Sequence, residues 1–227
     1  MQRWLLMVEM NCEPSREAEY EAWWQEVHVH DVLASPGYRR GRFFRIREPR
    51  DGRGRYLILW DVETADIERT MRERTERRDK EHAGGRHPAG LMYPVWRNLA
   101  WRETFSLLAP QNSAGAGCWL NLVEQNCDPK REAQYHAWYN ETHIPDALKT
   151  PAFVSARRYE AREPRDGRGR FLAAYEIETD DMEATMKVRL QKRDEEVKAG
   201  RGSASLNNLT RPVWRDVMWQ LAAEVKT

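Results

Sequence analysis

Residues 48–55 read Glu-Pro-Arg-Asp-Gly-Arg-Gly-Arg, and residues 163–170 repeat this run without a change. The repeat extends in both directions: residues 11–64 and 126–179 align without a gap, and 27 of the 54 positions are identical. Chance would leave only a few matches, so the chain contains two copies of one unit. The run itself carries the Asp-Gly signal of a β-hairpin tip, which predicts two adjacent strands around it in each copy.

Each copy predicts the same succession of strands and helices. Short apolar or alternating runs indicate strands, and longer segments with helical spacing indicate helices. The resulting order, β-α-β-β-α-β, is that of a ferredoxin-like unit, so the expected fold class is α+β. In the first copy the expected strands are 4–10, 38–47, 55–62 and 95–107, and the expected helices are 16–33 and 65–82.

A lone ferredoxin-like unit carries helices on one face of its sheet, so the other face needs a cover. The second copy supplies that cover most simply, sheet against sheet. The sequence therefore predicts a fused, pseudo-dimeric α/β barrel, with a tryptophan-lined cavity near paired histidines. The expected domains are the ferredoxin-like repeats 1–109 and 118–227, joined by a linker over 110–117 rich in small and turn-forming residues.

The charge balance bears on the class of partner. The chain has 37 Lys or Arg and 36 Asp or Glu residues, a formal net charge of +1. A nucleic-acid-binding protein would show a basic excess, so nucleic acid is not expected as a partner. No stretch approaches the roughly 20 apolar residues of a membrane helix, so a membrane is not expected either. The first residues lack the apolar core of a signal peptide, and three cysteines do not make a disulfide scaffold. We expect a cytoplasmic protein, whose chains can associate further as a homodimer.

Residues 138–153 read Trp-Tyr-Asn-Glu-Thr-His-Ile-Pro-Asp-Ala-Leu-Lys-Thr-Pro-Ala-Phe. This segment resembles the W-x-x-E-x-H-x-P-D-x-L-x-x-P-G-F signature of the dimeric α/β barrel superfamily (ethyl-tert-butyl-ether-degradation-like proteins). The first copy has His30 where the signature has proline, and the second has Ala152 where it has glycine. The resemblance implies the fold. It leaves the activity open, because the superfamily includes cofactor-free cyclases, monooxygenases, decarboxylases, lyases and isomerases, and also haem enzymes.

One stripe of the first expected helix in each copy carries groups suited to acid–base chemistry. A histidine titrates near neutral pH and a nearby carboxylate can hold its tautomer, although either histidine could instead cap the helix end. His30 is an additional candidate; the alternative is that it is merely an exposed histidine in a loop. The proposed catalytic residues are His28, Asp31, His143, Asp146 and His30, and the proposed ring-binding residues on the stripe are Tyr20, Trp24, Tyr135 and Tyr139.

The strands add further candidates for binding a substrate. Ten tryptophans fill a core, line an aromatic cavity, or do both, and Trp60 is the strand tryptophan proposed for the cavity. Arg42 and Arg157 could hold a carboxylate or phenolate, or face outward and pair with acids. The glycine-rich tip at 50–54 resembles an anion-binding nest, but a solvated turn is favoured.

Two features of the loops and helices carry weaker expectations. Pro145 should interrupt the second-copy helix, since proline lacks an N–H group. His82 and His87 flank Gly84-Gly85 in a segment that could close over a pocket. No metal site is expected, because His28 and His30 would point about 200° apart on a helix.

These residues favour an enzyme that needs no cofactor and acts on a small aromatic or hydrophobic compound by histidine acid–base chemistry. The reaction classes considered are lyase, decarboxylase, cyclase and isomerase. Two alternatives stay open: a non-catalytic small-molecule binding protein, and a haem protein with His28, His30 or His143 as the axial ligand.

Overall fold

The computed structural model describes residues 1–48, 52–110, 117–163, 165, 167–206 and 209–227. They form two compact units, the first comprising Met1–Arg102 with Leu221–Thr227 and the second Glu103–Gln220. Each unit has the predicted β-α-β-β-α-β order, and the fold is α+β with two ferredoxin-like repeats.

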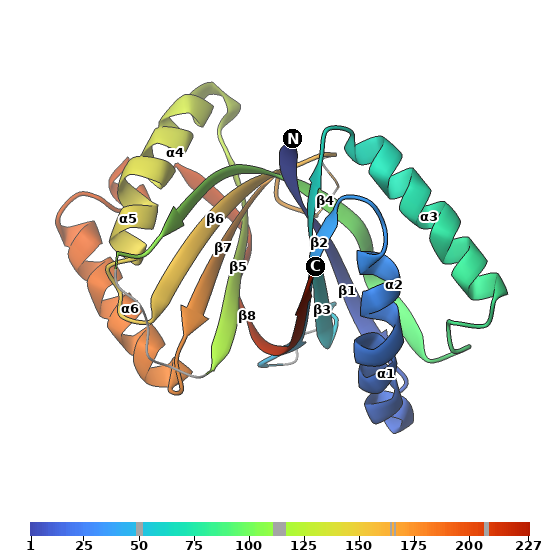
Figure 1. Cartoon of the computed structure of the whole chain (residues 1–227). Helices are drawn as coiled ribbons and strands as arrows, with labels where there is room; N and C mark the ends of the chain where they lie inside the picture. Colours follow the sequence, from blue (N-terminus) through green and yellow to red (C-terminus); the bar gives the residue numbers. More distant parts are fainter. Residues whose placement is uncertain (49–51, 111–116, 164, 166, 207–208) are drawn as a thin grey trace. The chain divides into compact units, whose positions relative to one another are not determined.

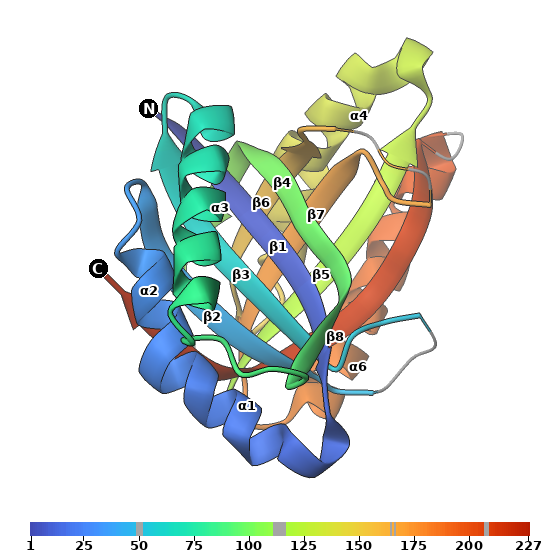
Figure 2. The same cartoon turned by 90° about the vertical axis from the view of Figure 1, so that its right-hand side faces the viewer.

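The first repeat contains one antiparallel sheet with helices on one face (Figures 1 and 2). Strand β1 lies between β3 and β4, and β2 pairs with the other edge of β3. Its elements are β1 (Gln2–Cys12), η1 (Pro14–Arg16), α1 (Glu17–Trp23), η2 (Trp24–His28), α2 (Val29–Leu33), β2 (Tyr38–Ile46), β3 (Tyr56–Thr64), α3 (Ile67–Ala83) and β4 (Met92–Leu108).

The second repeat has the same plan, with β5 between β7 and β8 and β6 paired with β7. Its helix α6 begins as α3 does, with an aspartate side chain, Asp181 or Asp66, accepting a hydrogen bond from a first-turn backbone N–H. Its elements are β5 (Cys118–Cys127), η3 (Pro129–Arg131), α4 (Glu132–Trp138), η4 (Tyr139–His143), α5 (Ile144–Ala147), β6 (Phe153–Ala161), β7 (Phe171–Glu178), α6 (Met182–Lys198), η5 (Ser203–Leu206) and β8 (Thr210–Lys226).

The last strand of each repeat runs past the boundary of its unit. The end of β8 joins the first unit, where the Thr227 N–H donates to the Arg39 carbonyl at 3.0 Å. The end of β4 joins the second unit, where the Ala109 N–H donates to the Val154 carbonyl at 2.9 Å. The compact units therefore differ from the two repeats by an exchange of strand ends.

The first helical segment of each repeat is continuous but contains one wide turn, η2 or η4. In these turns the backbone N–H of Val29 bonds to Trp24, and that of Ile144 bonds to Tyr139, five residues back rather than four. The expected break at Pro145 is wrong, since α5 runs through it. The proline lies in the first turn of α5, directly after the wide turn, where a missing N–H is tolerated.

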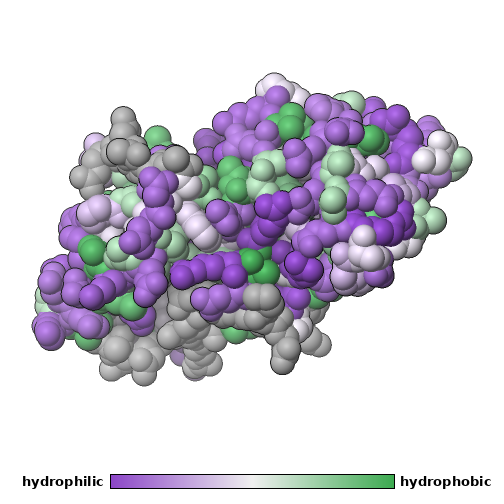
Figure 3. Space-filling view, turned by 90° about the horizontal axis from the view of Figure 1, so that it is seen from below, coloured by the Kyte–Doolittle hydropathy of each residue, from purple (hydrophilic) through white to green (hydrophobic). Residues whose placement is uncertain are grey.

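Most of the charged residues that the structure describes lie at the surface. The face seen in Figure 3 is mostly hydrophilic, with hydrophobic residues scattered over it. No helix within the described part of the chain is long and apolar enough to cross a membrane.

Candidate functional site

A cavity of about 740 Å³ lies in the first unit, between the sheet and the helices that cover it. Sequence reasoning placed the cavity between facing sheets, whereas the walls of this one belong to a single repeat. The sheet wall is apolar, because alternate residues of a strand share a face. This wall consists of Leu6, Val8 and Met10 from β1 and Ile58 and Trp60 from β3.

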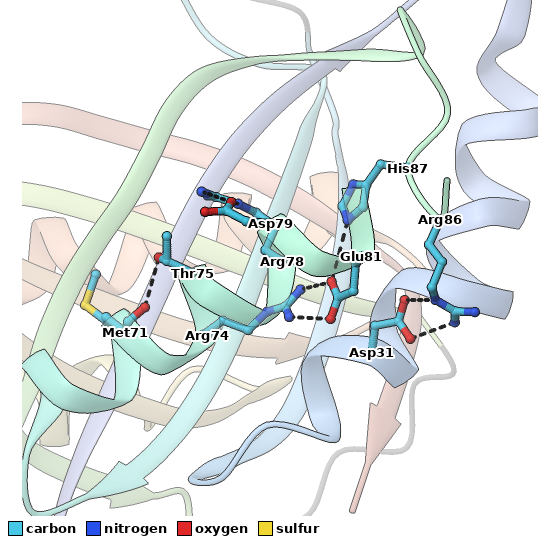
Figure 4. Close-up of polar contacts among 9 residues, drawn as sticks. All are labelled: Asp31, Met71, Arg74, Thr75, Arg78, Asp79, Glu81, Arg86 and His87. Atoms are coloured by element: carbon cyan, nitrogen blue, oxygen red, sulfur yellow. Dashed lines mark hydrogen bonds and ion pairs between the residues drawn. The ribbon is translucent and has the colours of Figure 1, made fainter. Parts of the chain in front are cut away.

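The opposite wall, formed by α3 and the loop after it, is strongly polar. Arg74 binds the Glu81 carboxylate through two hydrogen bonds of 2.6 and 2.7 Å, and the His87 Nε2 lies 3.6 Å from the same carboxylate. Figure 4 shows Arg74 and His87 reaching Glu81 from two sides. Burial would raise the pKa of Glu81, but the hydrogen bonds and charge of Arg74 outweigh it and lower that pKa. The cavity wall also includes Arg78, Asp79 and His82.

His28 lines this cavity at the end of the wide turn η2. Its ring stacks on Trp23 with centroids 4.6 Å apart and lies 5.5 Å from the ring of His87. The Nδ1 atom is buried and has no hydrogen-bond partner among the described residues. Burial, together with the positive charges of His87 and Arg74, lowers the pKa of His28 to about 3. The imidazole is therefore neutral at pH 7.

The expected carboxylate partners of the two histidines bind arginines instead. Asp31 forms a two-point ion pair with Arg86, at 2.7 and 2.8 Å (Figure 4), and Asp146 pairs with Arg201 at 2.9 Å. These arginines lie in the loops after α3 and α6. The spacing of residues along one helix could not show that the aspartates would pair with them. Burial would raise the pKa of Asp146, but Lys149 and Arg201 lower it. Neither aspartate is in position to orient its histidine.

The proposed ring-binding residues of the first repeat divide into two groups. Tyr20 and Trp60 line the cavity, and the Tyr20 hydroxyl is buried without a partner among the described residues. Trp24 is not in the wall, because it is fully buried against Phe43, with ring centroids 4.9 Å apart. Trp23, one residue earlier, takes its place beside His28.

Three other candidates lie away from the cavities. His30 is exposed. Arg42 is buried and donates to Asp61 at 2.7 Å, and Arg157 is partly buried. None of the three lines either cavity. Arg42 and Arg157 therefore have no place in the candidate site, and neither does His30.

The hairpin tip that is repeated in the two copies binds a carboxylate of the chain itself. Arg53 is buried and binds the Glu9 carboxylate, while the Gly54 N–H donates to the same carboxylate at 3.1 Å. Arg168 and Gly169 hold Glu124 in the same way. The interpretation of Arg53 and Gly54 as part of a solvated turn is thus wrong, because Glu9 on β1 completes the nest; residues 49–51 lie outside the described residues.

The second repeat has a smaller cavity of about 190 Å³, lined by Tyr139 and His143 among others. Burial and the positive charges of Arg189 and Arg193 lower the pKa of His143 to about 3. Tyr135 is fully buried outside this cavity, under the guanidinium of Arg158 at 4.8 Å from the ring centroid. Arg158 occupies the position of Phe43 in the first repeat.

Sequence reasoning missed Trp23, Arg74 and the pairing partner Glu81. A signal for the last two existed: Arg74 and Glu81 recur as Arg189 and Glu196 at the same offset of 115. The second pair forms the same double hydrogen bond, at 2.6 and 3.1 Å. Both arginines, Arg74 and Arg189, are buried. Among the described residues no cluster of three potential metal ligands exists.

Gly41 on β2 makes room for Trp60 at the sheet wall. A Cβ at this position would lie 2.5 Å from Cζ3 of Trp60, and the second repeat pairs Ala156 with the smaller Tyr175. We expect Gly41→Ala to lower the free energy of unfolding by about 1–3 kcal/mol, measured by urea denaturation. Adding Trp60→Tyr to the Gly41→Ala variant should restore most of the lost free energy of unfolding. If Gly41→Ala alone is as stable as the unaltered protein, the close packing of Gly41 against Trp60 is contradicted.

Stability should depend on pH through His28 and His143. Above pH 6.5 both imidazoles are neutral in the folded and unfolded chain; below it, only the unfolded chain binds protons until the pH approaches 3. Between pH 6 and 5, the free energy of unfolding should therefore fall by about 1 kcal/mol per pH unit for each histidine. Urea titrations of His28→Gln and His143→Gln should show a shallower slope than those of the unaltered protein; equal slopes in all three proteins would refute this prediction.

Fold and cavities together define an α+β protein of the dimeric α/β barrel class, with two tandem repeats and a separate cavity in each. The chain belongs to the family described as a domain of unknown function (DUF4286), whose model matches it twice, over residues 3–84 and 120–200. No curated protein sequence matches the chain.

Solved structures of this class align over nearly the whole chain. An anthrone oxidase-like protein has a TM-score of 0.62 at 11% identity, covering 99% of this chain and 93% of its own. A suggested monooxygenase from Fusobacterium nucleatum has a TM-score of 0.59 at 8% identity, covering 99% and 94%. A variant of the chlorite dismutase from Candidatus Nitrospira defluvii has a TM-score of 0.56 at 10% identity, covering 97% and 91%. At these identities the likeness is one of fold.

Proposed function

We propose that the first repeat is an enzyme site for a small aromatic compound bearing an acidic group, and that His28 transfers a proton to or from it. The observation that carries this proposal is the neutral His28 imidazole in the wall of the large cavity, with its Nδ1 buried and unpartnered. A buried polar atom without a partner is costly, and a ligand that supplies one removes the cost.

The shape and polarity of the cavity support an aromatic acid as the ligand. A volume of about 740 Å³ falls in the range of small-molecule sites, and the apolar sheet wall with Trp23 and Trp60 suits a ring. Arg74, bound to Glu81, and Arg78, bound to Asp79 at 3.1 Å, stand opposite, and their remaining N–H groups can donate to a carboxylate or phenolate. The name of the anthrone oxidase-like structure also points to an aromatic compound, which is in keeping with this ligand class.

The chemistry proposed is proton transfer without a cofactor, in a lyase, decarboxylase, cyclase or isomerase reaction. A neutral imidazole accepts the proton, and the nearby guanidinium groups stabilise the anion that remains on the substrate. Because its free pKa is low, His28 becomes a stronger base only when an anionic substrate lies beside it. Substrate binding and proton transfer are therefore coupled in this site.

The low pKa of His28 also favours a second candidate, a haem protein, because a metal-bound histidine must be neutral. Of the three histidines considered as axial ligands, only His28 lies in the large cavity. Bound haem would supply redox chemistry there.

Incubation of the purified protein with a panel of hydroxylated aromatic acids tests the proposal, with tryptophan fluorescence reporting binding and chromatography reporting products. We expect both quenching and product. Quenching without product would instead indicate a non-catalytic binding protein, and a Soret absorption band in the purified protein would indicate a haem protein.

A further inference from the structure

The cavity of the second repeat differs from the first in the polarity of its sheet wall. The first strand of each repeat points three alternate side chains into the cavity of that repeat. In the first repeat all three are apolar. The equivalent residues at the offset of 115 include two amides, so that Leu6, Val8 and Met10 become Asn121, Val123 and Gln125.

These amides are buried in the cavity wall and are not fully paired. Asn121 is 5% exposed and Gln125 3% exposed, and the Asn121 Oδ1 has no hydrogen bond within the described residues. The Gln125 amide and the hydroxyl of Tyr175, on the neighbouring strand β7, both lie beside the Tyr139 hydroxyl without a hydrogen bond of good geometry to it. Such atoms are rare in folded proteins because each lost hydrogen bond is costly, so they indicate a missing partner.

The helix side of the same cavity carries a net positive charge. Arg189 and Arg193 line it with one carboxylate, Glu196, which leaves two positive charges against one negative, or +1. His143 adds no charge at neutral pH, since burial and the two arginines lower its pKa to about 3. The wall therefore complements one negative charge.

We propose that the second repeat binds a short-chain 2-hydroxymonocarboxylate, with the carboxylate toward Arg189 and Arg193 and the hydroxyl at Asn121 and Gln125. A hydroxyl both donates and accepts, so it satisfies an amide oxygen and an amide nitrogen whichever way the amides are turned. A volume of about 190 Å³ equals that of about six water molecules in the liquid, which suits three to five carbons. The first repeat, with an apolar sheet wall, lacks this site.

Titration calorimetry on the full chain with 2-hydroxybutyrate tests the inference, and butyrate is the matched ligand without the hydroxyl. We expect one 2-hydroxybutyrate per chain and at least ten-fold weaker binding of butyrate, because butyrate leaves the buried amides unpaired. The double variant Asn121→Leu/Gln125→Met gives the second repeat the residues of the first, and it should bind 2-hydroxybutyrate at least ten-fold more weakly. Gln220→Leu, an exposed amide on β8, is the control and should bind normally.

Three results would overturn the inference: no binding, equal binding of butyrate, or unchanged binding in the double variant. If the double variant does not fold, a crystal structure of the unaltered chain with 2-hydroxybutyrate decides the matter. Density for the ligand against both amides supports the inference, whereas water alone in a saturated crystal refutes it. Neither result depends on the aromatic site of the first repeat, whose failure would appear separately in the fluorescence and product assays.

Discussion

Replacing His28 by alanine or glutamine is expected to lower turnover of an aromatic acid by about 10²- to 10⁴-fold, the usual contribution of a positioned acid or base. The reason is that His28 lines the large cavity, where its buried Nδ1 has no hydrogen-bond partner among the described residues. Binding of the substrate should weaken much less, because Arg74, Trp23 and Trp60 remain. We therefore expect the loss in kcat rather than in KM.

The matched control is His143, which has the same helix position but a cavity of only about 190 Å³. His143→Gln should leave turnover of an aromatic acid within a few-fold of the original. The pH profile adds an independent check: kcat/KM reports pKa values of the free enzyme, so protonation of His28 should cause no loss between pH 7 and 5. Equal activity of both histidine variants and the unaltered protein would remove His28 from the mechanism.

Arg53→Ala is expected to lower the free energy of unfolding by about 3–5 kcal/mol, the usual cost of leaving a buried charge unpaired. The side chains of Arg53 and Glu9 are only 3% and 0% exposed, and Arg53 and the Gly54 N–H together hold both carboxylate oxygens. Urea denaturation followed by circular dichroism measures the effect. Arg168→Ala should do the same in the second repeat, where Glu124 would lose its partner.

Two comparisons separate an unpaired buried charge from a general loss of packing. The double variant Glu9→Met/Arg53→Met removes both charges and should recover much of the stability lost in Arg53→Ala. Arg69→Ala breaks an exposed ion pair with Glu73 on α3 and should leave the denaturation curve nearly unchanged. If Arg53→Ala unfolds at the same urea concentration as Arg69→Ala, the buried pair does not stabilise the fold as we infer.

The order of elements could be predicted because it depends on local spacing. The apolar runs of β1 and β3 and the Asp-Gly pair between β2 and β3 each act within a few residues. The wide turns η2 and η4 could not be predicted, since an extra residue in one helical turn leaves the apolar pattern nearly intact. That turn separates Trp23, which lines the cavity, from Trp24, which does not.

The candidate site was predicted only in part, for a similar reason. His28, Tyr20 and Trp60 could be named because their strand and helix phases place them on the covered side of the sheet. The polar groups around them come from far along the chain: Glu81, which binds Arg74, and Arg86, which binds Asp31, lie more than fifty residues from His28. The same holds for the pairing of Glu9 with Arg53.

The sequence by itself determined the duplication, the two ferredoxin-like repeats and the histidine at one position in each, because identity and periodicity can be read along one dimension. Tertiary structure alone decided that each cavity lies under the helices of its own repeat, that the aspartates bind arginines, and that the two cavities differ in size and polarity. Those outcomes depend on which distant side chains share a buried space, where the cost of an unpaired charge or polar atom selects the partners.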